Sequence, residues 1–248
     1  MAVNLKKLPK INLSKGQVVC LTKDGHGSSA GLTRVFFGAS WKSNRSIDLD
    51  ASLICYDSNA NMLETIYYGH KDAANGSIHH SGDDLHGGAT YLADNETISI
   101  NLNKVHSNVK YIVATLNSYS GESFDKIKEV SSRIYTGSAG DPDEVLCGYT
   151  INNNSTFKNK TNVILGYFYR VGTGWKFRAD GTTSKDIRVN TIVNGVAKEV
   201  IMKDIHRDVT ETPSASTTTT TTPVPDVRVS IKVKKSLWEK ILDFFTYN

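Results

Sequence analysis

Short stretches of alternating apolar and polar residues, separated by Gly, Asn and Asp, recur along the first 181 residues. The clearest stretch runs from Ser46 to Asp57, and its apolar positions include Leu49, Ala51, Leu53 and Cys55. A period of two is typical of β-strands that turn one face to a core. Similar patterns predict strands at 17–23, 31–41, 63–69, 96–102, 109–119, 144–151, 162–171 and 174–181. Short strands at this spacing predict an all-β fold, namely a two-sheet antiparallel β-sandwich.

A short helix is expected within this series. Phe124, Ile127 and Val130 follow Ser123 at a spacing that places them on one helical face. The loop-like segment 69–95 is long for a compact domain, and loops of this length usually carry function or lack order.

The pattern changes after residue 181, so we divide the chain into five parts. Residues 1–10 form a basic arm, and 11–181 form the β-sandwich domain. Residues 182–208 predict a β-hairpin extension, because Asn194-Gly195 is typical of a type I′ turn. Residues 209–226 are a Thr/Pro-rich linker with too little apolar surface to pack. Residues 227–248 predict a strand and then a helix capped by Ser236 and Glu239.

The predicted C-terminal helix carries one apolar stripe that must be covered. The stripe consists of Leu237, Trp238, Ile241, Leu242 and Phe245. It packs either on its own domain or in a groove of a partner or second subunit. We favour docking on a protein partner or self-assembly, because the long linker would let the helix reach a neighbouring molecule. Weak contact with an anionic membrane surface is also compatible with the lysines of this tail, Lys232, Lys234, Lys235 and Lys240.

Composition excludes several classes of protein. The formal net charge of the 248 residues is +4, and no single element concentrates Lys and Arg, so nucleic-acid binding is not expected. Cys20, Cys55 and Cys147 form no CxxC pair, which argues against a zinc ribbon or a disulfide framework. No apolar signal region follows Met1, and no apolar run is long enough for a transmembrane segment. We therefore expect a cytoplasmic protein, or one associated with a virion.

Acidic residues provide the candidate chemistry. Asp48 and Asp50 lie two apart and share one face of a strand, where their charges repel unless a cation screens them. The long loop adds Asp83 and Asp84, and further oxygen donors follow at Asp94 and at Glu96. Carboxylate and carbonyl oxygens are the ligands that Ca²⁺ takes, although EF-hand spacing is absent. On composition alone, a solvated acidic loop explains these residues equally well.

Two other interpretations of the acidic loop are weaker. A glycosidase needs paired carboxylates, but nothing else in the sequence builds a sugar cleft. A transition-metal or pH-sensitive site would use His79, His80 and His86. Because their neighbours are hard oxygen donors, we interpret these histidines as loop residues, at least one of which pairs with a carboxylate.

Several motifs, taken in order, carry a family resemblance. They are INLSKGQVVCLTK, FGASW, IDLDASLICYD, YYGHKDAANGSIHHSGDDL and YFYRVGTGWKFRADG. Together they resemble the TerD family of tellurium-resistance and stress proteins over roughly residues 11–181. The resemblance implies a β-sandwich that binds calcium through acidic loops and performs no catalytic step.

The resemblance also implies particular ligands. Asp48, Asp50, Asp83 and Glu96 match acidic positions of the family, and Asp84 stands where the family often has Asn. The segment ATYLADN before Glu96 and the lysine after Trp41 depart from the family pattern, which argues against a second calcium site. We expect a calcium-binding stress-response module that acts as a scaffold through protein contacts and is not an enzyme. The alternative is a structural or assembly protein, for example of a virus particle, that attaches through its tail.

Overall fold

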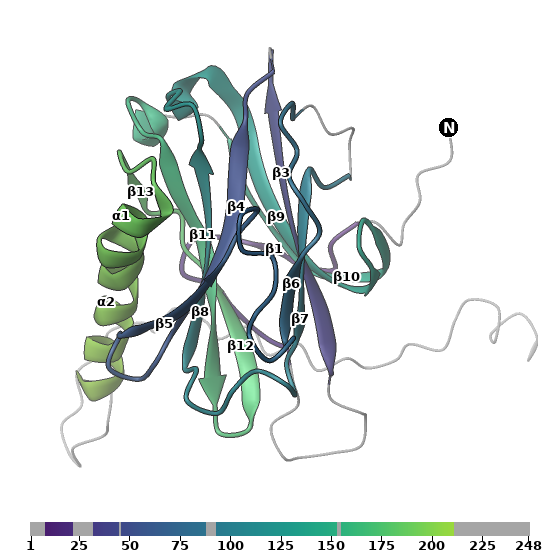
Figure 1. Ribbon diagram of the computed structural model, residues 1–248, viewed down its shortest axis with the longest axis vertical. Helices are drawn as coiled ribbons and strands as arrows, with labels where there is room; N and C mark the ends of the chain where they lie inside the picture. Colours follow the sequence, from purple (N-terminus) through teal and green to yellow (C-terminus); the bar gives the residue numbers. More distant parts are fainter. Residues whose placement is uncertain (1–7, 22–31, 45, 88–92, 153–154, 211–248) are drawn as a thin grey trace, which may run out of the picture.

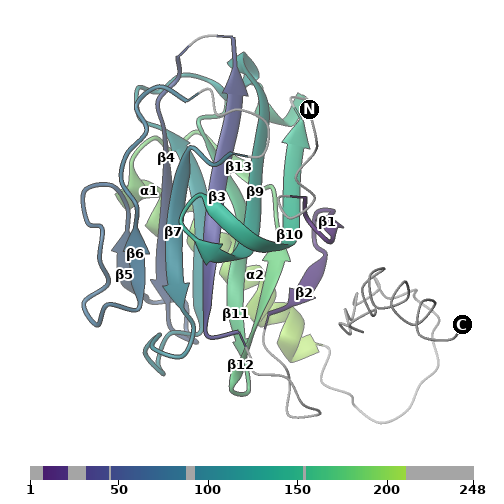
Figure 2. The same ribbon diagram turned by 90° about the vertical axis from the view of Figure 1, so that its right-hand side faces the viewer.

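The computed structural model describes residues 8–21, 32–44, 46–87, 93–152 and 155–210 of the chain (Figure 1). Two β-sheets face each other, as the alternating pattern predicts, and two helices lie on the outside of one of them. Figure 2 shows the same arrangement turned by 90°, with the sheet that contains β3, β9 and β10 in front of the helices. The predicted fold class, a mainly β two-sheet sandwich, is confirmed.

The first sheet has six strands. In spatial order they are β1 (Asn12–Leu13), β10 (Asp141–Asn152), β9 (Ile127–Ser138), β3 (Arg34–Ser43), β7 (Glu96–Asn101) and β6 (Ile78–His80). Strand β1 runs parallel to β10, and the other neighbours are antiparallel. Strand β6 lies inside the segment expected to be a long loop, so one short piece of that segment joins the sheet edge.

The second sheet has seven strands. Six of them follow the order β2 (Val18–Cys20), β12 (Gly174–Ala179), β11 (Asn162–Val171), β8 (Tyr111–Ser118), β4 (Leu49–Tyr56) and β5 (Met62–Ile66). The seventh strand, β13 (Thr183–Ser184), pairs with β11. The neighbours in this sheet are antiparallel.

The core between the sheets uses the predicted face of β4. Leu49, Ala51, Leu53 and Cys55 are buried in the cluster that also contains residues of the opposite sheet, such as Ile98. The other face of β4 carries Asp50 first and apolar residues farther along. The register inferred from the sequence is therefore the observed one, with the acidic residue on the face away from this core.

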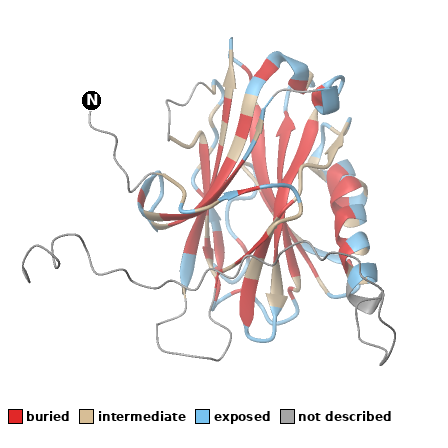
Figure 3. Cartoon of the chain, turned by 180° about the vertical axis from the view of Figure 1, so that it is seen from behind, coloured by how far each residue is buried: buried red, intermediate tan, exposed pale blue. Residues whose placement is uncertain are grey.

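The predicted β-hairpin at 182–208 is wrong, because this region forms helices α1 (Val189–Asn194) and α2 (Val196–Thr210). Gly195 separates them at φ −103°, whereas a type I′ turn needs a positive φ. Buried residues of the helices recur at helical spacing: Ile192, Val193, Val196, Ala197, Val200 and Ile201. They cover the outer face of the seven-stranded sheet, a second apolar face that includes Ile54, Tyr56 and Tyr167 (Figure 3). The β-branched residues of this region and the Asn194-Gly195 pair predicted strands. Helices form instead, because they can pack on the second apolar face of the seven-stranded sheet.

The helix expected after Ser123 is wrong beyond one turn, because Ile127 and Val130, two of the three residues that predicted it, lie in strand β9. A single 3-10 turn, η2 (Phe124–Lys126), precedes β9, and another, η3 (Ser155–Phe157), precedes β11. Helix α2 continues to Thr210, past the start predicted for the linker at 209. The tail stripe from Leu237 to Phe245 lies outside the described residues. No helix in the described part of the chain is long and apolar enough to cross a membrane.

Candidate metal centre

Three aspartates converge where β4 begins. Asp48 precedes the strand, Asp50 is its second residue, and Asp83 follows β6 at the edge of the other sheet. One carboxylate oxygen from each residue lies within 4.8 Å of those from the other two. We call these three residues the acidic cluster. The sequence placed two of them on one strand, and the fold brings the third to them from a distant segment.

The electrostatics of the acidic cluster are unfavourable for carboxylates alone. Asp50 is only 4% exposed, and burial, together with the charges of Glu96, Asp48 and Asp83, raises its pKa to about 7. The pKa of Asp48 is also raised, first by burial and then by neighbouring carboxylates, while His86 acts in the opposite direction. Crowded carboxylates of this kind favour a proton or a bound cation.

Two buried oxygens at this place also lack partners. Neither Asp48 Oδ1 nor Asn117 Oδ1 has a hydrogen-bond partner in the described part of the chain. Asn117 is 4% exposed, and its Nδ2 donates to Asp50 Oδ2 at 3.2 Å and to Ile187 O at 3.3 Å. Buried polar atoms are normally satisfied, so these oxygens require an electropositive group. The donor set of the acidic cluster, three carboxylates that supply only oxygen, fits a hard cation such as calcium.

Asp84 and Glu96 brace the loop instead of entering the acidic cluster. Asp84 Oδ1 accepts hydrogen bonds from the backbone of His86 and Gly87, and Oδ2 accepts one from Asn95 Nδ2 at 2.8 Å. Burial acts to raise the pKa of Asp84, but these hydrogen bonds outweigh it and lower the pKa below its ordinary value.

Each carboxylate oxygen of Glu96 accepts one backbone hydrogen bond. Its Oε2 accepts from Ala51 N at 2.7 Å, and its Oε1 accepts from Asp84 N at 3.2 Å. The side chain is 1% exposed, and it links β4 of one sheet to the Asp84 loop that follows β6 of the other. Glu96, which matches an acidic position of the family, therefore stabilises the segments that carry the three aspartates.

Asp94 lies in a different environment. Its Oδ1 accepts from Arg133 Nε at 2.7 Å, and its carboxylate lies directly over Gly38, where a side chain would collide with it. The structure thus places this predicted ligand in an ion pair on the six-stranded sheet, outside the acidic cluster.

The histidines of the segment 69–95 that were considered as metal ligands also lie in separate environments. His79 pairs through Nδ1 with Asp72 Oδ1 at 2.7 Å, near the surface. His80 is fully buried, with Nε2 at 3.2 Å from Ala51 O and at 3.4 Å from Glu96 Oε2. His79 and His80 belong to strand β6, whereas a loop was expected, and the expected pairing of a histidine with a carboxylate is confirmed at His79.

Sequence reasoning missed Asn117. It lies within β8 directly opposite Asp50 in the sheet register, so it reaches the acidic cluster from the neighbouring strand. An asparagine inside an apolar strand is the signal that could have singled it out, since that residue is depleted in strands.

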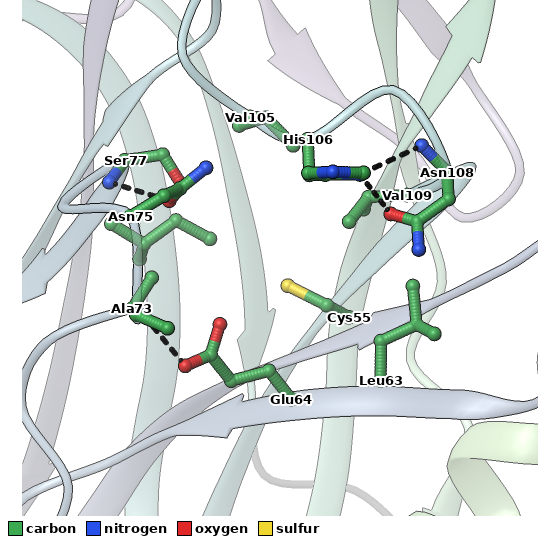
Figure 4. Close-up of a pocket in the computed structure, with 12 residues that line it drawn as sticks. Cys55, Leu63, Glu64, Ala73, Asn75, Ser77, Val105, His106, Asn108 and Val109 are labelled. Carbon is green, nitrogen blue, oxygen red and sulfur yellow. Dashed lines mark hydrogen bonds between the residues drawn. The ribbon is translucent and has the colours of Figure 1, made fainter.

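A separate cavity of about 290 Å³ opens between the edge strands β5 and β6 (Figure 4). Cys55 lies at its inner end, and Glu64 projects from β5 into it, with Oε1 accepting a hydrogen bond from Ala74 N at 2.8 Å. It shares no residue with the acidic cluster, so the two features are independent.

Fold and site together define an all-β sandwich protein with an acidic, oxygen-donor centre between loops of its two sheets. This chain belongs to the TerD family, because the family model, the TerD domain, matches residues 10–194. The match extends beyond residue 181, so helix α1 is part of the family domain, contrary to the boundary expected from the motifs.

Named relatives are shorter than this chain and are matched over nearly all of their own length, at modest identity. The tellurium resistance protein TerZ of Serratia marcescens is 26% identical over 77% of this chain and 99% of its own. Two Bacillus subtilis proteins are also similar. Stress response protein SCP2 is 29% identical over 74% of this chain and 98% of its own, and general stress protein 16U is 31% identical over 69% and 90%.

Solved structures support the fold. A Streptomyces coelicolor protein, described as a homologue of a telluride resistance protein (TerD), superposes with a TM-score of 0.52 at 17% identity. It covers 65% of this chain and 95% of its own. A protein of unknown function superposes with a TM-score of 0.53 at 16% identity and the same coverage.

Proposed function

We propose that this chain is a calcium-binding TerD-type module that serves the response to tellurium compounds or other stress as a scaffold and not as an enzyme. The observation that carries this proposal is the convergence of three carboxylates, one of which, Asp48, has a buried oxygen, Oδ1, without a hydrogen-bond partner in the described part of the chain. The names of the relatives, which refer to tellurium resistance and stress response, supply the biological setting.

Calcium suits the acidic cluster better than other metals do. Asp48, Asp50 and Asp83 supply only oxygen, whereas zinc and copper favour nitrogen and sulfur donors. Calcium accepts six to eight oxygens in irregular geometry, while magnesium demands a near-ideal octahedron. Backbone carbonyls and water would complete such a shell around carboxylates that come from separate segments.

A cation here would join the two sheets. Asp50 belongs to β4 of the seven-stranded sheet, and Asp83 follows β6 of the six-stranded sheet. Side chains from both sheets would then hold one ion, which fixes the loop after β6 against β4. This rigid end of the sandwich is the surface we assign to the scaffold role.

The test is calorimetric titration of chelator-stripped protein with calcium, together with its melting temperature with and without the ion. We expect saturable binding and, at a hundredfold excess over Kd, a rise of about 5–10 °C. Asp48→Asn and Asp83→Asn should each weaken binding, because each removes a ligand charge.

Asp72→Asn is the matched control, since Asp72 is an exposed loop carboxylate that pairs with His79 outside the acidic cluster. It should leave binding unchanged. Absence of both heat and a melting shift in the wild-type protein would refute the calcium proposal. Equal loss in all three variants would show that general loop charge, and not the acidic cluster, attracts the ion.

A further inference from the structure

Exposed apolar side chains occur on segments that are connected to the acidic cluster. Leu85, Tyr119 and Ile187 are 55%, 59% and 41% exposed, and we call these three residues the rim. Water-exposed side chains of this size on one end of a molecule, around a charged centre, indicate a contact surface when they gather. They come from three segments, which follow β6, follow β8 and precede α1.

Each rim residue is tied to the acidic cluster through one or two links. Leu85 lies two positions after Asp83 in the same loop. Tyr119 donates its backbone N–H to Asp48 O at 3.2 Å. Ile187 O accepts from Asn117 Nδ2, and that amide also donates to Asp50 Oδ2. The rim is therefore built into the same framework as the three carboxylates.

Basic side chains accompany the rim. Lys185 and Arg188 flank Ile187 in the chain and are exposed. Lys71 is exposed as well, and its Nζ lies beside Gly82, where an added Cβ would be 3.7 Å away. The end of the sandwich thus offers an acidic centre, apolar projections and positive charge together.

We propose that this end of the sandwich docks on an anionic phospholipid bilayer when the acidic cluster holds calcium, an inference that rests on the proposed function. A phospholipid supplies all three partners: phosphate oxygens for a bound cation, negative charge for the lysines and arginine, and an acyl boundary for the rim. Without the cation, Asp48, Asp50 and Asp83 repel phosphate and keep the rim from the surface. Binding of the ion therefore controls membrane contact.

The experiment is cosedimentation of the full chain with vesicles of phosphatidylcholine alone or mixed with phosphatidylserine, in calcium or in EDTA. We expect binding to the mixed vesicles in calcium and its reversal by EDTA. Replacing the rim (Leu85→Ala, Tyr119→Ala, Ile187→Ala) should weaken vesicle binding by at least about tenfold, because the buried apolar area is lost. The same variant should keep the calcium titration of the wild-type protein.

Met62→Ala with Val171→Ala is the matched control. These side chains are 48% and 39% exposed, comparable with the rim. Met62 pairs with Tyr56, at the other end of β4 from Asp50 and about 20 Å away. Val171 lies at that same end, since Tyr169, two positions before it in β11, is opposite Tyr111, which is opposite Tyr56. Vesicle binding of this control should equal that of the wild-type protein.

The outcomes separate the two proposals. If calcium binding is detected by calorimetry but the protein does not bind vesicles, only the docking proposal is overturned. The rim would then be assigned to a protein partner. Absence of calcium heat would overturn the metal centre, and the docking proposal with it. Vesicle binding that persists in EDTA and in the rim variant would assign membrane contact to other basic residues, such as Lys232, Lys234 and Lys235, and would also overturn the docking proposal.

Discussion

Glu96 and Asp83 carry the same charge, but their surroundings give them different roles. Glu96 is 1% exposed, and both of its oxygens accept backbone hydrogen bonds, from Ala51 and Asp84. Asp83 is exposed, and one of its oxygens faces those of Asp48 and Asp50. The first residue belongs to the framework of the protein, whereas the second is available to a cation.

Glu96→Gln should destabilise the protein even without metal. Gln replaces one accepting oxygen by an NH₂ group, which then faces a buried backbone N–H, and we expect a loss on the order of 1–3 kcal/mol. Asp83→Asn should change the free energy of unfolding by less than about 0.5 kcal/mol, as is usual at exposed positions. Urea unfolding of both variants in EDTA measures the difference. Equal effects of the two substitutions would contradict the roles assigned here.

Asp50 makes stability depend on pH. Its pKa in the folded state, about 7, lies above the ordinary value of 3.8, so the folded protein holds a proton that the unfolded chain releases. The stability that this proton contributes is complete below about pH 4 and is lost as the pH rises to about 7. Relative to the wild-type protein, Asp50→Asn should therefore gain stability across this window, by on the order of 1–3 kcal/mol at pH 7.5.

The measurement is urea unfolding of the metal-free protein at several pH values. A difference between Asp50→Asn and the wild-type protein that grows from pH 4 to pH 7 is the expected result. Parallel curves would mean that Asp50 titrates at its ordinary pKa, and that the burial and crowding at this carboxylate are without thermodynamic effect.

At the scale of elements, helix α2 is fastened to the seven-stranded sheet by a buried polar contact. Asp204 is 3% exposed and accepts a hydrogen bond from Tyr167 Oη at 2.8 Å. Arg178 Nε and Arg207 Nη1 lie at 3.8 and 3.5 Å from the same carboxylate oxygen. The burial and the charge of Asp204 raise the pKa of Tyr167, so this hydroxyl stays protonated and donates.

Asp204→Ala should cost on the order of 2–4 kcal/mol, because it leaves the buried Tyr167 hydroxyl without its acceptor and removes the carboxylate that forms an ion pair with Arg178. Asp204→Asn keeps an acceptor for Tyr167 and should cost clearly less. Chemical unfolding followed by far-ultraviolet circular dichroism reports both values. A loss below about 0.5 kcal/mol for Asp204→Ala would show that apolar packing alone holds α2 on the sheet.

At the scale of the molecule, the acidic cluster lies where the two sheets meet at one end of β4. Glu96 already connects the sheets by hydrogen bonds, and a cation held by Asp50 and Asp83 would connect them a second time. Melting of the whole domain is then the appropriate readout of metal binding, since both sheets contribute to one core. The segments of the rim are connected to the acidic cluster, so metal occupancy and the proposed docking would be coupled through shared loops.

Alternation along the chain was enough to determine most of the strands, the core face of β4 and the sandwich. It did not find β9, where Ile127 and Val130 predicted a helix, or β6, which lies inside the expected loop. A period of two is a local property, and the core between the two sheets enforces it in strands that have only one buried face. The motifs determined the family by resemblance, and the family match confirmed it. They also brought Asp48, Asp50 and Asp83 into one hypothesis, and the fold places these three side chains together.

Only the tertiary structure decided the rest. Residues 189–210 are helical because the sheet offers a second apolar face, which no local pattern reveals. The different positions of Asp84, Asp94 and Glu96 follow from which backbone amides and which arginine lie opposite them. Asn117 reaches Asp50 only because β8 pairs with β4. A carboxylate has the same chemistry everywhere in a sequence, and the partners that long-range pairing brings to it determine what it does.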